Sequence, residues 1–69
     1  MKVHVKSFPR GEIDRSVELG SKSTVLDLLK VLDLRPDSWI AIRADRAIPD
    51  DAELIDKEAI KLLSVVSGG

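Results

Sequence analysis

The chain has no cysteine among its 69 residues, and aromatic residues make up only 3% of it. Without cysteine there is no disulfide, no thiolate metal ligand and no cysteine nucleophile, so the fold depends on packing alone. An excess of basic charge is also missing, because 11 Lys and Arg stand against 12 Asp and Glu. Scattered, balanced charge argues against direct nucleic-acid binding, which needs a clustered basic face.

Long hydrophobic runs are absent too. The sequence therefore predicts neither a membrane span nor a secretory signal, and we expect a cytoplasmic protein without a membrane partner. Hydrophobic residues make up 43% of the chain and charged residues 33%, which is typical of a globular domain. We expect one domain, residues 1–69, with a small core and a flexible C-terminal Gly-Gly tail.

The N-terminal part alternates between apolar and polar residues. Residues 2–8 and 13–19 each show this alternation, which predicts two half-buried strands. Between them, Pro9, Arg10 and Gly11 supply the chemistry of a turn, because proline fixes φ and glycine is permissive. These residues predict a β-hairpin.

A helix is predicted next. Ser23 or Thr24 can cap its first amides, and Asp27 falls in the first turn, where a negative charge suits the helix dipole. The apolar residues recur at helical spacing and form one stripe: Val25, Leu28, Leu29 and Leu32. The helix is expected to end at residues 34–36, because a residue before proline leaves the α region.

Two further strands are predicted, at residues 39–43 and 59–66. Residues 44–58 between them hold a turn at Asp45–Arg46, an extended stretch around residues 48–49, and an acidic cluster that is either a solvated loop or a helix start. The order ββαββ predicts an α+β fold, in which one helix packs on a mixed sheet of four to five strands. The last strand is expected to pair in parallel with the first.

The sequence ends with an apolar run followed by Ser67, Gly68 and Gly69. Two terminal glycines arise by chance in about one chain in 200. Their position directly after a predicted strand indicates a short tail that leaves a rigid sheet. An interaction module in which the glycines are incidental is one interpretation of this pattern.

Several of these segments carry a family resemblance. The hairpin, the helix beginning at Thr24-Val25, the strand Trp39-Ile40-Ala41-Ile42-Arg43 and the ending Leu62-Leu63-Ser64-Val65-Val66-Ser67-Gly68-Gly69 resemble the ubiquitin-like β-grasp sulfur carriers and modifiers. The chain is most similar to the prokaryotic carrier for 2-thiolation of tRNA uridine, through residues 35–43 and 63–69. It departs from the family at residues 56–59, where many members have a Gly-Asp turn.

The resemblance implies a carrier that is not itself an enzyme. An E1-like adenylating enzyme would use ATP and Mg²⁺ to activate the Gly69 carboxylate, which is anionic and unreactive at neutral pH. Sulfur attack would then give a thiocarboxylate for a sulfurtransferase or synthase acceptor enzyme, in tRNA thiolation or in thiamine thiazole or molybdopterin synthesis. Attack by a lysine of a target protein would instead make the chain a protein modifier. The chain itself is expected to bind no cofactor and no metal.

The same family docks on its enzymes through the sheet face and the tail. If Ile40, Ile42, Ile60 and Leu62 face the helix, the opposite face carries an exposed apolar patch edged by charge. The expected docking residues are Ala41, Lys61, Leu63 and Val65, to which the resemblance adds Arg43. In the alternative interpretation, Leu63 merely covers the end of the core. His4 stands alone on a solvent-facing position, so neither a metal site nor a general base is predicted there.

Overall fold

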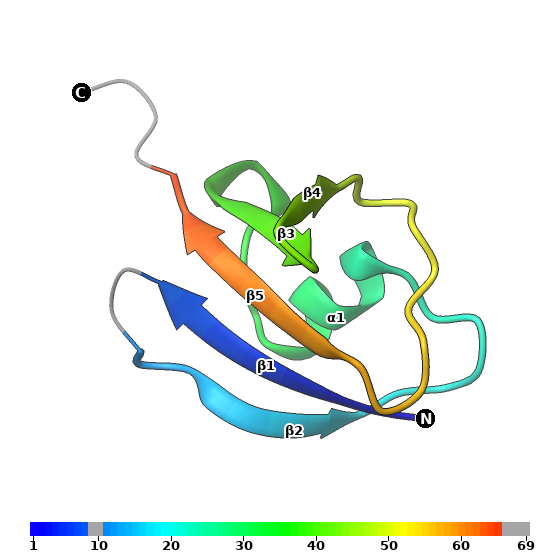
Figure 1. Cartoon of the computed structure of the whole chain (residues 1–69). Coiled ribbons are helices and arrows are strands. Elements are labelled where there is room, and N and C mark those ends of the chain that lie inside the picture. Colours follow the sequence, from blue (N-terminus) through cyan, green and yellow to red (C-terminus); the bar gives the residue numbers. More distant parts are fainter. Residues whose placement is uncertain (9–10, 66–69) are drawn as a thin grey trace.

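A five-stranded mixed sheet with one α-helix on one side forms the fold (Figure 1). The computed structural model describes residues 1–8 and 11–65, so Pro9 and Arg10 of the predicted turn and residues 66–69 lie outside the described part. The elements follow the chain as β1 (Lys2–Phe8), β2 (Asp14–Glu18), α1 (Val25–Val31), the 3₁₀ turn η1 (Pro36–Ser38), β3 (Trp39–Arg43), β4 (Arg46–Ile48) and β5 (Ala59–Ser64). The predicted α+β class and mixed sheet are confirmed.

The strand order in the sheet is β2-β1-β5-β3-β4. β1 and β5 are parallel, with Val5 opposite Ile60, whereas β1–β2, β3–β5 and β3–β4 are antiparallel. The predicted parallel pairing of the first and last strands is therefore confirmed. The first and last strands of the chain, β1 and β5, are therefore neighbours in the interior of the sheet.

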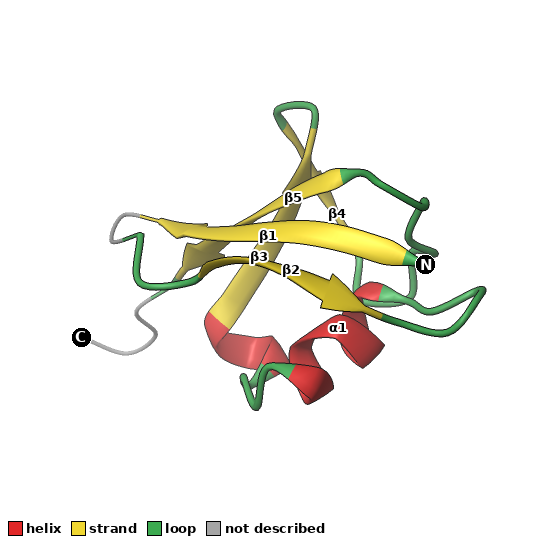
Figure 2. Cartoon of the chain, turned by 90° about the horizontal axis from the view of Figure 1, so that it is seen from below, coloured by secondary structure: helices red, strands yellow, loops and turns green. Residues whose placement is uncertain are grey.

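The core lies between the sheet and α1, which crosses one face of it (Figure 2). Strand alternation sends Val3 and Val5 of β1 and Ile60 and Leu62 of β5 to the helix side, where each is at most 1% exposed. α1 contributes its stripe to the same core, and its fully buried members are Val25, Leu28 and Leu29. Within the described residues no helix is long and apolar enough to cross a membrane.

A capping box starts α1, as the sequence predicts. Thr24 Oγ1 accepts a hydrogen bond from the Asp27 amide, and the Asp27 carboxylate accepts one from the Thr24 amide at 2.9 Å. The Thr24 amide and the Thr24 hydroxyl both donate to the Asp27 carboxylate, and these two hydrogen bonds lower the pKa of Asp27 below its ordinary value. Two more of the first amides find loop carbonyls: Val25 donates to Ala52 and Leu26 to Asp50.

The helix ends at Val31, earlier than the predicted end at residues 34–36. Asp33 takes a positive φ of 59°, its amide donates to Lys30, and the Leu34 amide donates to Leu29 at 2.8 Å. These two bonds form a Schellman motif, which usually uses glycine at the left-handed position. Because aspartate tolerates that conformation, the motif stops the helix before proline does.

The 44–58 segment contains a short strand and a loop. The turn between β3 and β4 is made by Ala44 and Asp45, with φ of 49° and 67°, one residue earlier than predicted. Two consecutive positive φ angles give a tight hairpin whose twist suits the flanking strands. The acidic residues Asp50, Asp51 and Glu53 are exposed in the loop that follows, so the loop interpretation is confirmed.

A partly buried ion pair fixes the end of this loop. Arg43 Nε lies 2.6 Å from Glu58 Oε1 and Arg43 Nη2 lies 2.8 Å from Oε2, a bidentate geometry. Arg43 Nη2 also donates to the Glu53 carbonyl, and the Ile55 amide donates to Glu58. The Glu58 side chain is only 11% exposed. The pair therefore ties residues 53–58 to the sheet.

The buried helix stripe makes a stability prediction. Leu28 is 0% exposed, whereas Val31 on the same helix is 54% exposed. We expect Leu28→Ala to lower the free energy of unfolding by about 2–5 kcal/mol, because it removes buried methyl groups and leaves a cavity. Val31→Ala should change it by less than about 0.5 kcal/mol. Urea denaturation measures both, and equal losses would contradict the assigned helix face.

The Arg43–Glu58 pair predicts a pH dependence. Burial raises the pKa of Glu58, but the hydrogen bonds from Arg43 and the Ile55 amide, with the Arg43 charge, outweigh it and hold the pKa below the ordinary value. A lowered carboxyl pKa gives stability that is present above about pH 4.3 and is lost as pH falls through the folded-state pKa. The free energy of unfolding should therefore fall less steeply in acid for Glu58→Gln than for the wild type.

At neutral pH, Glu58→Gln should cost about 1–3 kcal/mol, since Arg43 loses its charged partner. Asp45→Asn removes a carboxylate whose side chain is 92% exposed, and it should stay within about 0.5 kcal/mol of the wild type. Urea titrations at a series of pH values provide both measurements. Parallel acid profiles for Glu58→Gln and the wild type would show that the pair contributes nothing.

Candidate functional site

The face of the sheet opposite α1 is open, and β5 contributes to it in the predicted phase. Lys61 and Leu63 alternate with the buried Ile60 and Leu62, and Leu63 is 37% exposed. Val65, directly after β5, is also 37% exposed. The predicted exposure of Lys61, Leu63 and Val65 is confirmed, while their docking role stays a prediction.

The phase of β3 is opposite to the predicted one. Ala41 is 3% exposed and stands opposite the buried Leu62, so its predicted place on the open face is wrong. Ile40 stands opposite Leu63 and Ile42 opposite Lys61, which places both isoleucines on the open face and not on the helix side. Residues 39–42 are all apolar, so their pattern does not reveal the phase, and a shift of one residue exchanges the two faces.

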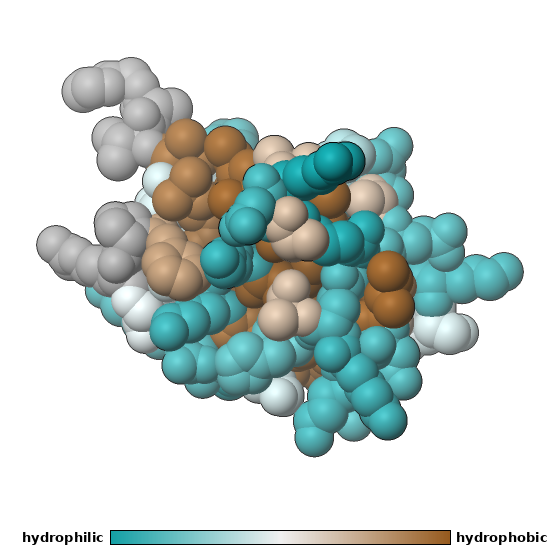
Figure 3. Space-filling view, in the orientation of Figure 1, coloured by the Kyte–Doolittle hydropathy of each residue, from teal (hydrophilic) through white to brown (hydrophobic). Residues whose placement is uncertain are grey.

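A shallow apolar hollow of about 280 Å³ results on the open face, lined by Phe8, Ile42, Lys61 and Leu63. We call these four residues the Phe8 patch. Phe8 comes from the end of β1 and stands opposite Leu63 of β5. Figure 3 shows the hydrophobic residues gathered over the ends of these two strands, within a largely hydrophilic surface. An exposed apolar patch of this kind is a candidate interaction site.

Two lysines approach the aromatic ring of this patch. Lys6 Nζ lies 5.7 Å and Lys61 Nζ 5.8 Å from the centroid of the Phe8 ring, within the range of cation–π attraction. Lys6 and Lys61 are directly opposite each other on β1 and β5. Lys61 also lies 3.7 Å from an oxygen of Asp45. The rim of the Phe8 patch is therefore positively charged.

Arg43 is placed differently from the other predicted docking residues. Its side chain is 29% exposed and is held by Glu58 and by the Glu53 carbonyl. Because alternation puts Arg43 on the same side of β3 as Ala41, it does not join the Phe8 patch. The structure thus brings Lys61 and Leu63 together and leaves Ala41 and Arg43 apart from them.

His4 is exposed, as predicted, and lies among polar neighbours on β2. Its Nε2 is 2.7 Å from Asp14 Oδ1, and its Nδ1 is 3.4 Å from Ser16 Oγ. Across residues 1–8 and 11–65, no three His, Asp or Glu side chains are grouped so that they could hold a metal ion. The His4 contacts are cross-strand pairs of the hairpin.

The Phe8 patch lies at the end of the sheet from which the chain continues toward residue 69. The Val65 amide donates to the Ser38 carbonyl at 2.9 Å and fixes that exit. Ser67, Gly68 and Gly69, the predicted tail residues, are outside the described residues. Gly69 is the fourth residue after Val65 in the sequence, and four residues span at most about 14 Å. A partner on the Phe8 patch is thus within reach of the chain end.

Comparison with protein-family models assigns the chain to a family. The family model of small archaeal modifier protein 2, SAMP2, matches residues 1–66. The chain belongs to this family. Comparison with curated proteins finds no matching relative.

Solved structures confirm the ubiquitin-like β-grasp fold. A ubiquitin from Caldiarchaeum subterraneum matches with a TM-score of 0.76 at 20% identity, covering 100% of this chain and 98% of that one. SAMP1 from Haloferax volcanii matches with a TM-score of 0.75 at 20% identity over 100% of both chains. A ubiquitin-like protein from the same Caldiarchaeum species matches with a TM-score of 0.61 at 19% identity, over 99% of this chain and 100% of that one. The resemblance drawn from the sequence to small ubiquitin-like β-grasp proteins is confirmed.

The sequence interpretation missed Lys6, Phe8 and Ile42. A signal for two of them was present, because Lys2, His4, Lys6 and Phe8 are the even positions of an alternating strand whose odd positions are buried. An aromatic residue at the end of an otherwise polar face indicates an interaction site rather than core. Ile42 had no such signal, since its neighbours along β3 are also apolar.

The two faces of the sheet can be separated by substitution. We expect Ala41→Leu to lower the free energy of unfolding by about 1–3 kcal/mol, because Ala41 is buried and the larger side chain overpacks the core. Leu63→Gln on the open face should cost less than about 1 kcal/mol. Thermal and urea denaturation test this, and a tolerated Ala41→Leu combined with a damaging Leu63→Gln would reverse the face assignment.

Proposed function

We propose that this protein is a ubiquitin-like carrier whose Gly69 carboxylate is activated by an E1-like adenylating enzyme and converted to a thiocarboxylate. The observation that carries the proposal is the position of the Phe8 patch at the end of the sheet from which the chain runs toward Gly69. A docked enzyme would hold the domain by the patch and receive the chain end in its active site. Family membership supports the same interpretation.

The chemistry follows from the carboxylate. At neutral pH it is anionic and a poor electrophile, with a free α-carboxyl pKa of about 3.3–3.7. Attack of its oxygen on the α-phosphorus of ATP forms an acyl-adenylate and releases pyrophosphate. A sulfur nucleophile at the oxidation level of hydrosulfide then attacks the acyl carbon and displaces AMP, which gives a thiocarboxylate. Glycine suits this end because it lacks a Cβ and passes narrow channels.

The chain acts in this scheme as a protein co-substrate and not as an enzyme. ATP, Mg²⁺ and any catalytic thiol belong to the adenylating partner, in the cytoplasm where ATP is available. A sulfurtransferase or synthase then accepts the sulfur. We propose tRNA 2-thiolation as the destination, on the sequence resemblance at residues 35–43 and 63–69, with thiamine thiazole and molybdopterin synthesis as the other acceptor pathways.

A second function shares the first step. The matching family is described as a modifier protein, which favours attachment of the chain to target proteins. A lysine amine of the target attacks the same acyl-adenylate, or a thioester derived from it, and forms an isopeptide bond while AMP or the thiol leaves. The two outcomes differ only in the nucleophile that arrives at the Gly69 carbonyl.

Intact-mass analysis of the protein from its own cells distinguishes the two. Replacement of one terminal oxygen by sulfur is expected for the carrier, and Gly-Gly remnants on lysines of other proteins are expected for the modifier. Deletion of the genes for E1-like enzymes should abolish both signals. Absence of both signals in wild-type cells that express the adenylating enzyme would refute the proposal.

Deletion of Gly69 separates docking from chemistry. The shortened protein should still bind the adenylating enzyme through the Phe8 patch, with pyrophosphate release reduced to background. Phe8→Ala is the matched variant, since it keeps the chain end and removes the ring. Loss of binding in the Gly69 deletion, with normal binding of Phe8→Ala, would place recognition in the tail.

A further inference from the structure

Resting on the proposed function, we propose that Lys6 and Lys61 act with the Phe8 patch to recognise an acidic, apolar segment of the partner protein. A carboxylate of the partner lies between the two ammonium groups, and an adjacent aliphatic or aromatic side chain enters the hollow. This assigns Lys6, which no family resemblance identified, to the docking surface. It also defines the chemistry that the docked partner presents.

The first argument is the register of the two lysines. Lys6 of β1 and Lys61 of β5 are directly opposite each other on the open face. Like charges in this arrangement destabilise a sheet. The repulsion between the two ammonium groups therefore lowers the stability of the sheet. An anionic ligand bound between them would reduce this repulsion.

The second argument is that their intramolecular counter-charges are weak. Within residues 1–8 and 11–65, the one ion-pair partner of Lys61 is Asp45, at 3.7 Å, and the Asp45 side chain is 92% exposed to water. The carboxylate opposite Lys6 on β2 is Asp14, which is bound to His4 at 2.7 Å. Among the described residues, Lys6 forms no ion pair. Exposed pairs of this kind contribute little, so both ammonium groups remain available.

The Phe8 ring positions the two charges. Both ammonium groups lie within 6 Å of its centroid, so the ring quadrupole holds them at the rim of the hollow. Their aliphatic stems cover apolar surface while the charged ends stay in water. The rim is therefore partly preorganised, which reduces the entropy lost when a partner binds.

The neighbouring hollow determines the rest of the ligand. Phe8, Ile42 and Leu63 line it together with the Lys61 stem, so it fits an apolar side chain. Acidic side chains elsewhere on the open face, Asp14 and Glu18 of β2, oppose an extended phosphate backbone. With a formal net charge of −1, the protein as a whole does not attract nucleic acid. An acidic protein segment fits better than an RNA.

A direct binding test uses two synthetic peptides and a short oligouridine RNA. One peptide carries a leucine flanked by glutamates, and the other replaces the glutamates with glutamines. NMR titration of the labelled protein should show shifts at Phe8, Lys61 and Leu63 with the acidic peptide. Its affinity should fall about three- to tenfold in the K6Q/K61Q double variant and also with added salt.

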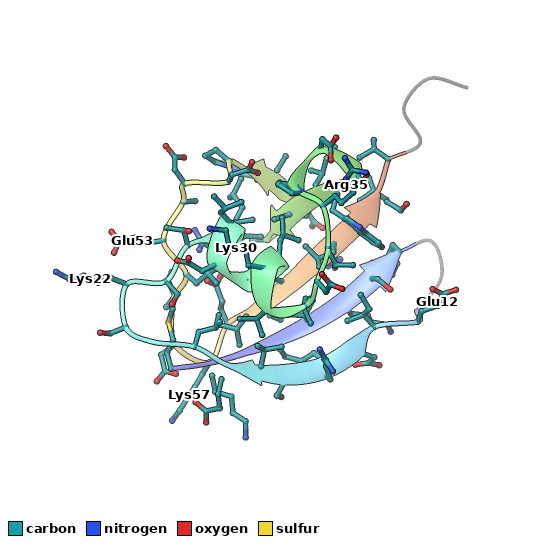
Figure 4. All side chains as sticks on the ribbon, turned by 180° about the vertical axis from the view of Figure 1, so that it is seen from behind. Glu12, Lys22, Lys30, Arg35, Glu53 and Lys57 are labelled. Carbon is teal, nitrogen blue, oxygen red and sulfur yellow. The ribbon has the colours of Figure 1, made fainter. Side chains whose placement is uncertain are left out.

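The control variant is K22Q/K30Q, which removes the same charge at two exposed lysines of α1 and the loop before it, where Figure 4 shows Lys22 extending away from the fold. It should bind the acidic peptide like the wild type. Urea denaturation confirms that both double variants are folded. Failure of the acidic peptide to bind, equal binding of the two peptides, equal loss in both double variants, or preference for the RNA would each overturn the proposal.

Kinetics with the E1-like enzyme separates this inference from the proposed function. K6Q/K61Q should raise the KM for the carrier in pyrophosphate release about three- to tenfold and leave kcat unchanged, since the lysines do not touch the reacting carboxylate. No turnover of the wild type would refute the proposed function, while the peptide titration would still test the lysines. Normal turnover with an unchanged KM in K6Q/K61Q would refute the lysine assignment alone.

Discussion

The parallel pairing of β1 and β5 is the constraint on which the rest of the structure depends. Their inward residues, such as Val5 and Ile60, are almost fully buried, and the register continues as far as Phe8 and Leu63. Parallel neighbours cannot be joined by a tight turn, so the chain between them must cross over the sheet. In this protein the connection contains β2, α1 and the β3–β4 hairpin, with α1 crossing one face of the sheet, and the same pairing places the Phe8 patch at the exit end of the sheet.

Short local motifs, rather than long helices, fix the conformation of this small chain. The Thr24–Asp27 capping box and the left-handed Asp33 delimit a helix of only seven residues. The Arg43–Glu58 pair holds a loop that has little regular hydrogen bonding of its own. A domain of this size buries a smaller fraction of its surface than a larger one, so each such contact is a larger share of the total stability.

The sequence predicted the parts whose signals are local. The alternation of Val3 and Val5 with polar residues gave β1 its correct face, and Thr24 with Asp27 located the start of the helix. The wrong predictions concern features that are decided by contacts between distant segments or that carry no local sequence signal. The phase of β3 could not be read from four apolar residues in succession, and the turn at Ala44–Asp45 carries no glycine or asparagine to mark it. In the candidate site, Lys61 and Leu63 were found from the strand pattern, whereas Lys6 and Phe8 join them only through the register of two distant strands.

The central position of β5 also determines how the domain resists force. β1 begins at the end of the sheet where the N-terminus lies. β5 runs parallel to β1 and finishes at the opposite end of the sheet (Figure 1). A pull between the N-terminus and the exit of β5 therefore acts along both strands and loads their hydrogen bonds in shear, all at once. Bonds loaded together resist more than bonds that open one after another. A motor protein that pulls on the C-terminal end would therefore have to break the hydrogen bonds between β1 and β5, in the middle of the sheet, first.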